Sequence, residues 1–204
     1  MGLKRYSPRA DPTDEQLVQL YRTGRDAAFE TLVQRYRQEL FHFLVRFTGT
    51  RQAAEDVFQD AFLQVHQSIE TFQINLRFRP WLFTIAANKA RDYLRRSNRR
   101  PTTSLSGSTG GDGEERSVLD VLQADMDLPQ EQFEQKETRQ LVQNVVQSLP
   151  EHLREILLLA YFQQMPYKQI AQVLHIPLGT VKSRLHTAVG TFAQKWKQSI
   201  EPKA

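Results

Sequence analysis

The stretch MPYKQIAQVLHIPLGTVKSRLHTAV, from Met165 to Val189, decides the fold of the C-terminal part of the chain. It predicts two short helices separated by a tight corner, His175-Ile176-Pro177. Two short amphipathic helices joined by a tight turn are typical of the helix-turn-helix motif, whose second helix lies in a DNA major groove. Apolar residues recur at helical steps of three and four in both segments, at Ile170, Ala171 and Leu174 and then at Val181, Leu185, Ala188 and Phe192.

Helix signals continue through most of the chain before this motif. Thr13 followed by Gln16 forms a capping box ahead of a first helix. Asp26 is expected to cap a long second helix that ends at Gly49, and Thr50 is expected to cap a third. No strand-like alternation stands out, so the sequence predicts an all-α fold. Further helices are expected at about 51–69, 79–98 and 131–148, and from 151 onward.

The distribution of charge divides the chain into two helical parts. Residues 101–137 hold nine acidic residues against two basic ones, a net of −7, while the whole chain carries +4. This segment opens with PTTSLSGSTGGDGEER, a composition that cannot bury enough apolar surface to order itself. We therefore expect two small helical domains joined by a flexible acidic linker, with the helix-turn-helix in the second. The expected boundaries are 13–98, 99–131 and 132–199.

Composition limits the classes of protein that the chain can belong to. It has 204 residues, a mildly basic pI near 9.4, no cysteine and five scattered histidines. No disulfide framework or thiolate metal site is available, and we expect neither a cofactor nor a metal. The N-terminus lacks the apolar stretch of a signal peptide, and the longest apolar run, Ile156 to Phe162, is too short to cross a bilayer. We expect a cytoplasmic protein without membrane insertion.

The helix expected at 51–69 has two different faces. At 100° per residue, one face gathers apolar residues that predict a buried stripe: Ala54, Val57, Phe58, Ala61, Val65 and Ile69. The opposite face carries Asp56, Gln59, Asp60 and Leu63. A solvated acidic face is the simplest interpretation, but an apolar residue within it favours contact with a partner that is basic where it meets the carboxylates.

The helix expected at 79–98 carries the opposite charge. One side holds an aromatic residue, an amide and several guanidinium groups, which can stack on bases, bond their edges and neutralise phosphates. Asp92 is the only acidic residue among five arginines in the ten positions from Arg91 to Arg100. Taken by itself, Trp81 can equally be a residue of the hydrophobic interior. The side as a whole favours single-stranded nucleic acid, with Arg79, Trp81, Asn88, Arg91 and Arg95 as candidate contacts.

These residues carry a resemblance to a known family. AEDVFQDAF, then FRPWLFTIAANKARDYLRR, an acidic linker and LPEHLREILLLAYFQQMPYKQIAQVLHIPLGTVKSRLHTA resemble a bacterial RNA polymerase sigma factor. The order is similar to that of the small two-domain branch called extracytoplasmic-function (ECF) sigma factors. The resemblance covers roughly 14–198 and joins two independent signatures, which makes it more specific than a helix-turn-helix alone.

The resemblance implies a promoter-specific transcription initiation factor rather than an enzyme. By resemblance, the first domain binds the polymerase core enzyme and the promoter −10 element, and the second reads the −35 element. Asp56, Gln59, Asp60 and Leu63 would meet the clamp helices of the largest polymerase subunit. The loop before the fourth helix would form a pocket for a flipped −10 base, with Asn88 lining it, although Pro80 replaces the small polar residue common in relatives.

The resemblance also assigns the second helix of the motif to −35 recognition. Small and polar residues there allow close approach to base edges, and its two cationic residues can take phosphate or guanine. Relatives usually continue with arginines after the Leu-His pair, whereas this chain has TAVGTF, which weakens the expected phosphate grip. The candidate −35 contacts are Thr180, Lys182, Ser183, Arg184, His186 and Thr187.

Two alternatives stay open at the level of sequence. A stand-alone helix-turn-helix regulator explains the second domain, but it leaves the acidic face and the arginine-rich helix unexplained. A DNA-processing enzyme needs clustered carboxylates, and Asp56 and Asp60 have no third ligand nearby in the sequence. By resemblance, an anti-sigma protein is one further candidate partner. By resemblance, the acidic linker would thread the polymerase's basic cleft, and a simple spacer is the alternative.

Overall fold

A computed structural model describes residues 11–99 and 133–200 of the chain, and every regular element in those ranges is helical. The expected linker therefore lies almost entirely outside the described residues. The N-terminal half contains α1 (Asp14–Arg22), α2 (Asp26–Thr48), α3 (Arg51–Ser68), the 3₁₀ turn η1 (Ile69–Thr71) and α4 (Phe78–Arg99). The C-terminal half contains α6 (Phe133–Gln147), α7 (Glu151–Leu157), the π-helical turn η2 (Leu158–Phe162), α8 (Tyr167–Leu174) and α9 (Leu178–Ile200).

Local capping explains where most of these helices begin and end. Thr13 and Gln16 form the predicted capping box of α1, and Thr50 caps α3 by accepting a hydrogen bond from the Ala53 amide. Gly49 ends α2 in the left-handed conformation, with φ of 91°. The prediction for Asp26 was wrong. Asp26 is the first residue of α2, where its charge suits the helix dipole, and the capping position is Arg25, whose side chain makes no capping bond.

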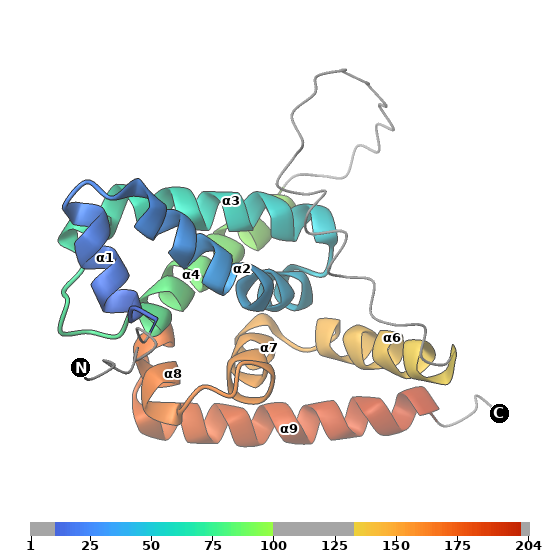
Figure 1. The fold of residues 1–204 in the computed structure, drawn as a ribbon. Coiled ribbons are helices and arrows are strands. Elements are labelled where there is room, and N and C mark those ends of the chain that lie inside the picture. The colour runs from blue at the N-terminus through green and yellow to red at the C-terminus, as the bar shows by residue number, and fades with distance from the viewer. Residues whose placement is uncertain (1–10, 100–132, 201–204) are drawn as a thin grey trace, which may run out of the picture.

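The two halves share one continuous hydrophobic interior, which the sequence did not predict. Phenylalanines of α2 and α4, including the fully buried Phe43 and Phe83, lie in the same cluster as Ile156 and Leu158 of the C-terminal half. Figure 1 shows α7 and α8 packed below α2 and α4, with α9 along the opposite side of the molecule from α3. Helix α8 contacts α4, and η2 and α6 contact α2.

The helix-turn-helix has the predicted layout. Its first helix, α8, ends at Leu174, and the next residue, His175, adopts the left-handed conformation with φ of 52°. After the corner, α9 runs for 23 residues and packs against α6, α7 and α8. Val181, Leu185 and Ala188 of α9 are buried, as the helical spacing predicted. This packing fixes which side of α9 is left exposed.

Candidate nucleic-acid interface

The acidic face of α3 lies fully on the surface. Asp56, Gln59, Asp60 and Leu63 are all exposed, and Leu63 keeps 56% of its surface accessible. The opposite stripe is buried, which is the division that the helical spacing predicted. An exposed leucine beside two carboxylates therefore forms a small amphipathic face on this side of the N-terminal half. Such a face suits a partner with both a basic group and an apolar contact.

A groove of mixed charge separates this face from α4. It is lined by Asp60, Lys89, Asp92, Arg95 and Arg96. Within the groove, Arg95 Nη1 lies 3.5 Å from Asp92 Oδ1, and both side chains are well exposed. Arg95 is thus placed next to the acidic face of α3 and is free to exchange its weak partner for a phosphate.

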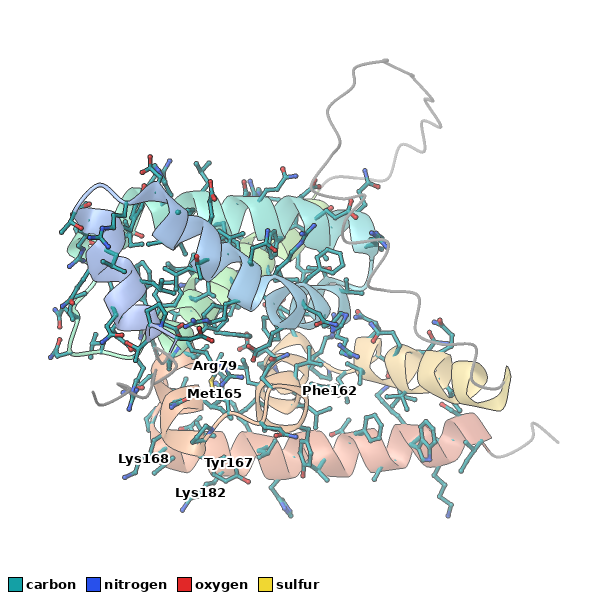
Figure 2. The ribbon with its side chains drawn as sticks, viewed as in Figure 1. Arg79, Phe162, Met165, Tyr167, Lys168 and Lys182 are labelled. Atoms are coloured by element: carbon teal, nitrogen blue, oxygen red, sulfur yellow. The ribbon has the colours of Figure 1, made fainter. Side chains whose placement is uncertain are left out.

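The first turn of α4 places Arg79 between the two halves. Its guanidinium pairs with Glu39 of α2, and Nη2 donates to the Gln163 carbonyl oxygen at 2.7 Å. The same group lies over the Phe83 ring, 5.3 Å from its centroid. Figure 2 shows Arg79 close to Met165, where the C-terminal half meets α4. Arg79 therefore already has protein partners for the charge that was predicted to meet DNA.

Trp81 lies in an aromatic cluster. Its ring is partly buried, 4.8 Å from the Phe72 ring and 5.7 Å from the Phe78 ring by centroid. This partly buried position is compatible with both roles that the sequence left open for Trp81, packing in the interior and stacking on a base. The remaining exposed part of the indole is what a base could contact.

Asn88 and Arg91 form a connected pair on the next turns of α4. Asn88 is exposed, and its side-chain oxygen accepts a hydrogen bond from Arg91 Nη2. Arg91 Nε lies 3.6 Å from Oε2 of Glu155, a residue of α7 that is only 3% exposed. Burial raises the pKa of Glu155 to about 7, although the charges of Arg91 and Arg184 oppose that rise. The candidate DNA contact Arg91 thus faces a buried carboxyl of the other half.

A pocket of ≈ 460 Å³ lies beside the start of α4, between the two halves. Its lining is mixed in charge, with three arginines, two acidic residues and several neutral ones: Arg35, Arg77, Arg79, Asp14, Glu15, Thr13, Tyr36, Pro80, Pro166 and Gln169. It occupies the place where a base-accepting pocket was expected. Asn88 does not line it, because Asn88 lies more than two helical turns further along α4.

The outer side of α9 carries most of the predicted −35 residues. Lys182, Ser183, His186 and Thr187 are exposed, and Thr180 is partly buried. Arg184 differs from this group, because it is partly buried and close enough to Glu155 for its charge to act on that carboxyl. Arg184 is therefore directed toward the α7 side of α9.

Two exposed residues of α8 add to this surface. Tyr167 and Lys168 occupy the first turn of α8, and Figure 2 shows Lys168 and Lys182 both extending away from the N-terminal half. The sequence prediction missed them because it considered only the second helix of the motif. The general rule that the first helix crosses the DNA backbone could have pointed to Lys168.

Within the described ranges 11–99 and 133–200, no three histidine, cysteine, aspartate or glutamate side chains gather as metal ligands would. Across the same described residues, no helix combines the length and apolar character needed to cross a membrane.

Comparison with known proteins gives consistent similarities across both halves. The family models described as Sigma-70 region 2 and Sigma-70, region 4 match residues 32–100 and 139–190. The RNA polymerase sigma-H factor of Pseudomonas aeruginosa is 35% identical over 86% of this chain and 89% of its own length. The ECF RNA polymerase sigma-E factor of Haemophilus influenzae is 33% identical over 86% of this chain and 91% of its own.

Solved structures share the fold. CnrH, solved in complex with the cytosolic domain of CnrY, has a TM-score of 0.64 and 22% identity, covering 91% of this chain and 97% of the other. The sigma factor RpoE of Bartonella quintana, solved with the anti-sigma factor NepR, has a TM-score of 0.60 and 19% identity. That match covers 85% of this chain and 98% of the other.

Proposed function

The chain belongs to the ECF sigma factors of the sigma-70 family and directs RNA polymerase to promoters, and we propose which of its surfaces do so. Sigma factors are transcription initiation factors that bind the polymerase core enzyme and promoter DNA. The N-terminal half would hold the polymerase and the −10 element, and the C-terminal half the −35 element. We place the protein in the cytoplasm, where both partners are found.

The α3 face is the proposed docking site for the clamp helices of the largest polymerase subunit. Asp56, Gln59 and Asp60 offer carboxylates and an amide to basic groups, and Leu63 offers an apolar contact. Burying such a leucine at an interface contributes on the order of 1–2 kcal/mol. The exposure of Leu63 in a surface that is otherwise acidic is the observation that supports this assignment.

The arginine side of α4 is the proposed site for the non-template strand of the −10 element. Promoter melting needs no covalent chemistry from the sigma subunit, because a surface that holds unpaired bases shifts the duplex–bubble equilibrium. Each stacked base contributes on the order of 1–3 kcal/mol. Arg79, Trp81, Asn88, Arg91 and Arg95 are the proposed contacts, and the charge of this helix supports them.

The outer side of α9 is the proposed reader of the −35 element. Its exposed residues are small or polar, which lets the helix approach base edges in the major groove. Thr180, Lys182, Ser183, His186 and Thr187 are the proposed contacts, and Arg184 would join them only by turning away from Glu155. Lys168 would hold a phosphate at the edge of the same groove.

One experiment tests the whole assignment. Run-off transcription with polymerase core enzyme on a genomic promoter library should yield transcripts that depend on this chain. A stand-alone regulator would instead protect a specific duplex without polymerase, and a DNA-processing enzyme would cleave DNA when magnesium or manganese is added. Either result in place of sigma-dependent transcripts would refute the proposed function.

An anti-sigma protein is a further proposed partner. The two structural neighbours were solved in complexes, one with the cytosolic domain of CnrY and one with the anti-sigma factor NepR. The shared fold supports a search for such a partner by pull-down from the source bacterium. The proposed partner should compete with the polymerase core enzyme for the chain.

A further inference from the structure

Three aromatic rings meet where the connection from α3 enters α4. Trp81 packs against Phe72 and Phe78, which are only 4% and 0% exposed, and the centroids of those two rings are 5.9 Å apart. Phe72 directly follows η1, and Phe78 is the first residue of α4. The two buried rings at the ends of the connection therefore set the position of the partly exposed indole.

Arg22, the last residue of α1, holds the first end of this connection. Its Nη2 donates to the Phe72 carbonyl oxygen at 2.6 Å, and its Nε donates to the Ile69 carbonyl oxygen at 3.0 Å. Nε also lies 3.8 Å from the carboxylate of Glu70, whose side chain is 70% exposed. Because the donors of a guanidinium are fixed in one plane, a single side chain determines where the backbone lies at both ends of η1.

Glu15, in the first turn of α1, holds the other end. Its Oε1 accepts a hydrogen bond from the Phe78 amide at 3.1 Å. This amide belongs to the first turn of α4, where the helix itself supplies no acceptor, and a carboxylate there also suits the helix dipole. Glu15 therefore acts as the capping group of α4, although it lies 63 positions earlier in the chain.

Helix α1 is fixed to α2 at a different point. Tyr36 donates a hydrogen bond to Asp14, and Arg35 pairs with the same carboxylate. Neither of these bonds involves the backbone between α3 and α4. Figure 1 shows α1 at one end of the N-terminal half, with the connection from α3 to α4 passing beside it. Helix α1 thus links α2 to both ends of the connection.

We propose that Glu15 and Arg22 are positioning residues for capture of a −10 base, and that they act by holding Phe72 and Phe78, on which Trp81 rests. This role rests on the proposed function of Trp81 as a base-stacking group. The bonds of both α1 residues end on backbone groups of the connection, so their effect on DNA passes through the rings. An indole that is already fixed binds a base more tightly, because less side-chain freedom is lost on binding.

Binding of a fork-junction promoter by the holoenzyme tests this role. The DNA is a promoter that the run-off library yields, with its non-template −10 strand unpaired and one base at a time replaced by an abasic site. Trp81→Ala should weaken binding, and the abasic position at which that loss disappears identifies the captured base. Glu15→Ala and Arg22→Ala should each weaken binding about fivefold, the lower end of what one stacked base contributes, and should lose their effect at the same position.

Combined substitutions separate positioning from a general loss of stability. If Glu15 acts through Trp81, the double variant Glu15→Ala/Trp81→Ala should bind no more weakly than Trp81→Ala alone, whereas independent effects would multiply. Glu15→Gln keeps an acceptor oxygen for the Phe78 amide, so it should restore most of the affinity that Glu15→Ala loses.

Two matched controls remove neighbouring contacts and spare the connection. Tyr36→Phe loses the hydrogen bond from α2 to Asp14 but keeps the ring. Glu70→Gln removes the exposed ion pair of Arg22 but leaves the carbonyl contacts of that guanidinium in place. Both controls should bind the fork-junction promoter as the wild type does, even where their Tm falls.

The fluorescence of Trp81 gives a measurement without DNA. The chain has two tryptophans, so Trp196→Phe leaves Trp81 as the only indole. In that background its emission should shift to longer wavelength in Glu15→Ala and Arg22→Ala, and in neither control. Wild-type promoter binding by an α1 variant, or multiplied losses in the double variant, would overturn the positioning role of that residue. Wild-type binding by Trp81→Ala would instead refute the base contact proposed for Trp81, and the positioning role with it.

Discussion

At the scale of single residues, Leu63 and Asp60 carry the proposed polymerase contact. Asp60→Arg should abolish binding to the polymerase core enzyme, because it reverses the charge offered to a basic partner. Leu63→Ser should weaken binding by about 1–2 kcal/mol. A pull-down with core enzyme measures both. The helical circular-dichroism signal should stay intact, because both side chains are exposed. Unchanged core affinity for Asp60→Arg would rule out the assignment.

The buried carboxyl group of Glu155 should make the stability of the folded chain depend on pH. Burial raises its pKa to about 7, above the ordinary value of 4.5, so the folded chain binds this proton more tightly than the unfolded chain does. The stabilising contribution is complete below pH 4.5 and is lost as the pH rises through about 7. The charged groups that act on it are Arg91 of α4, Glu151 of α7 and Arg184 of α9.

Glu155→Gln keeps the shape of the side chain and removes this titration. The variant should melt a few degrees higher than the wild type at pH 8, since one kcal/mol shifts Tm by about 2–4 °C in a chain of this size. Near pH 4.5 the two proteins should melt alike. A wild-type advantage at pH 8 would mean instead that the charge pair with Arg91 outweighs the cost of burial.

At the scale of helices, Gly49 links the end of α2 to the C-terminal half. Its φ of 91° disfavours any side chain, and a Cβ there would lie 2.9 Å from Gln147 Oε1. That amide cannot move freely, because Nε2 donates to Arg46 and Oε1 accepts from Arg154. Gly49→Ala should therefore cost about 1–2 kcal/mol of conformational strain and about 1 kcal/mol more for a disturbed hydrogen bond.

Gly24 supplies the control for that substitution. It has a similar φ of 86°, but a Cβ there would meet nothing within 4 Å. Gly24→Ala should show only the conformational cost. Thermal or urea unfolding of both variants gives the difference between them. Equal losses of stability would mean that Gln147 adapts without cost and that the contact between the halves adds nothing at this point.

The lysines of the helix-turn-helix test the −35 surface. Lys168→Ala should weaken binding to −35 promoter DNA uniformly across sequences and make the salt slope shallower by about one, as expected for a single phosphate contact. Lys182→Ala should do the same if it binds phosphate, but it should cost about 1–3 kcal/mol at one base pair if it binds guanine. Selection from randomised −35 DNA separates these results. If one of the two variants binds −35 DNA as the wild type does, the lysine changed in that variant does not contact the DNA.

Helix positions and faces could be predicted because they depend on neighbours in the sequence. The capping box at Thr13 and the exposed side of α3 follow from spacings of three and four residues, and the end of α2 follows from the glycine at position 49. The surroundings of Arg91 could not be predicted, because Glu155 lies 64 residues further along the chain. The π-helical turn η2 and the positive φ of Gln164 likewise depend on packing against α2 and α8 rather than on local propensity.

At the scale of the whole molecule, the sequence indicated two helical parts with an acidic stretch between them, but it did not indicate that the parts pack together. The apolar residues of each half suffice to explain a separate interior by helical spacing alone. Whether the two interiors join depends on which helix faces pack against each other. Contacts such as Phe162 with Arg46 and Arg154 with the Phe47 carbonyl group contribute to that choice. Complementarity of this kind has no signature in a single sequence.

The acidic stretch between the halves lies almost entirely outside the described residues, and its net charge of −7 suggests a role in polymerase binding. Six of its carboxylates can be changed to amides, which keeps the length of the chain and raises its net charge from +4 to +10. We propose that these carboxylates guide the chain into the basic cleft of the polymerase and give way to the growing transcript. The residues to change are Asp112, Glu114, Glu115, Asp120, Asp125 and Asp127.

The amide variant should still melt the promoter, because it keeps every proposed contact on α3, α4 and α9. At low salt, where charges act over about 30 Å, it should bind the polymerase core enzyme more weakly than the wild type does. At 0.15 M salt, where charges act over only about 8 Å, this difference in affinity should be smaller. The ratio of short abortive transcripts to full-length RNA should also change, since fewer carboxylates then compete with RNA phosphates in the cleft. Run-off assays and core titrations at both salt concentrations measure these effects. If neither the ratio nor the core affinity differs from the wild type, the stretch acts only as a spacer.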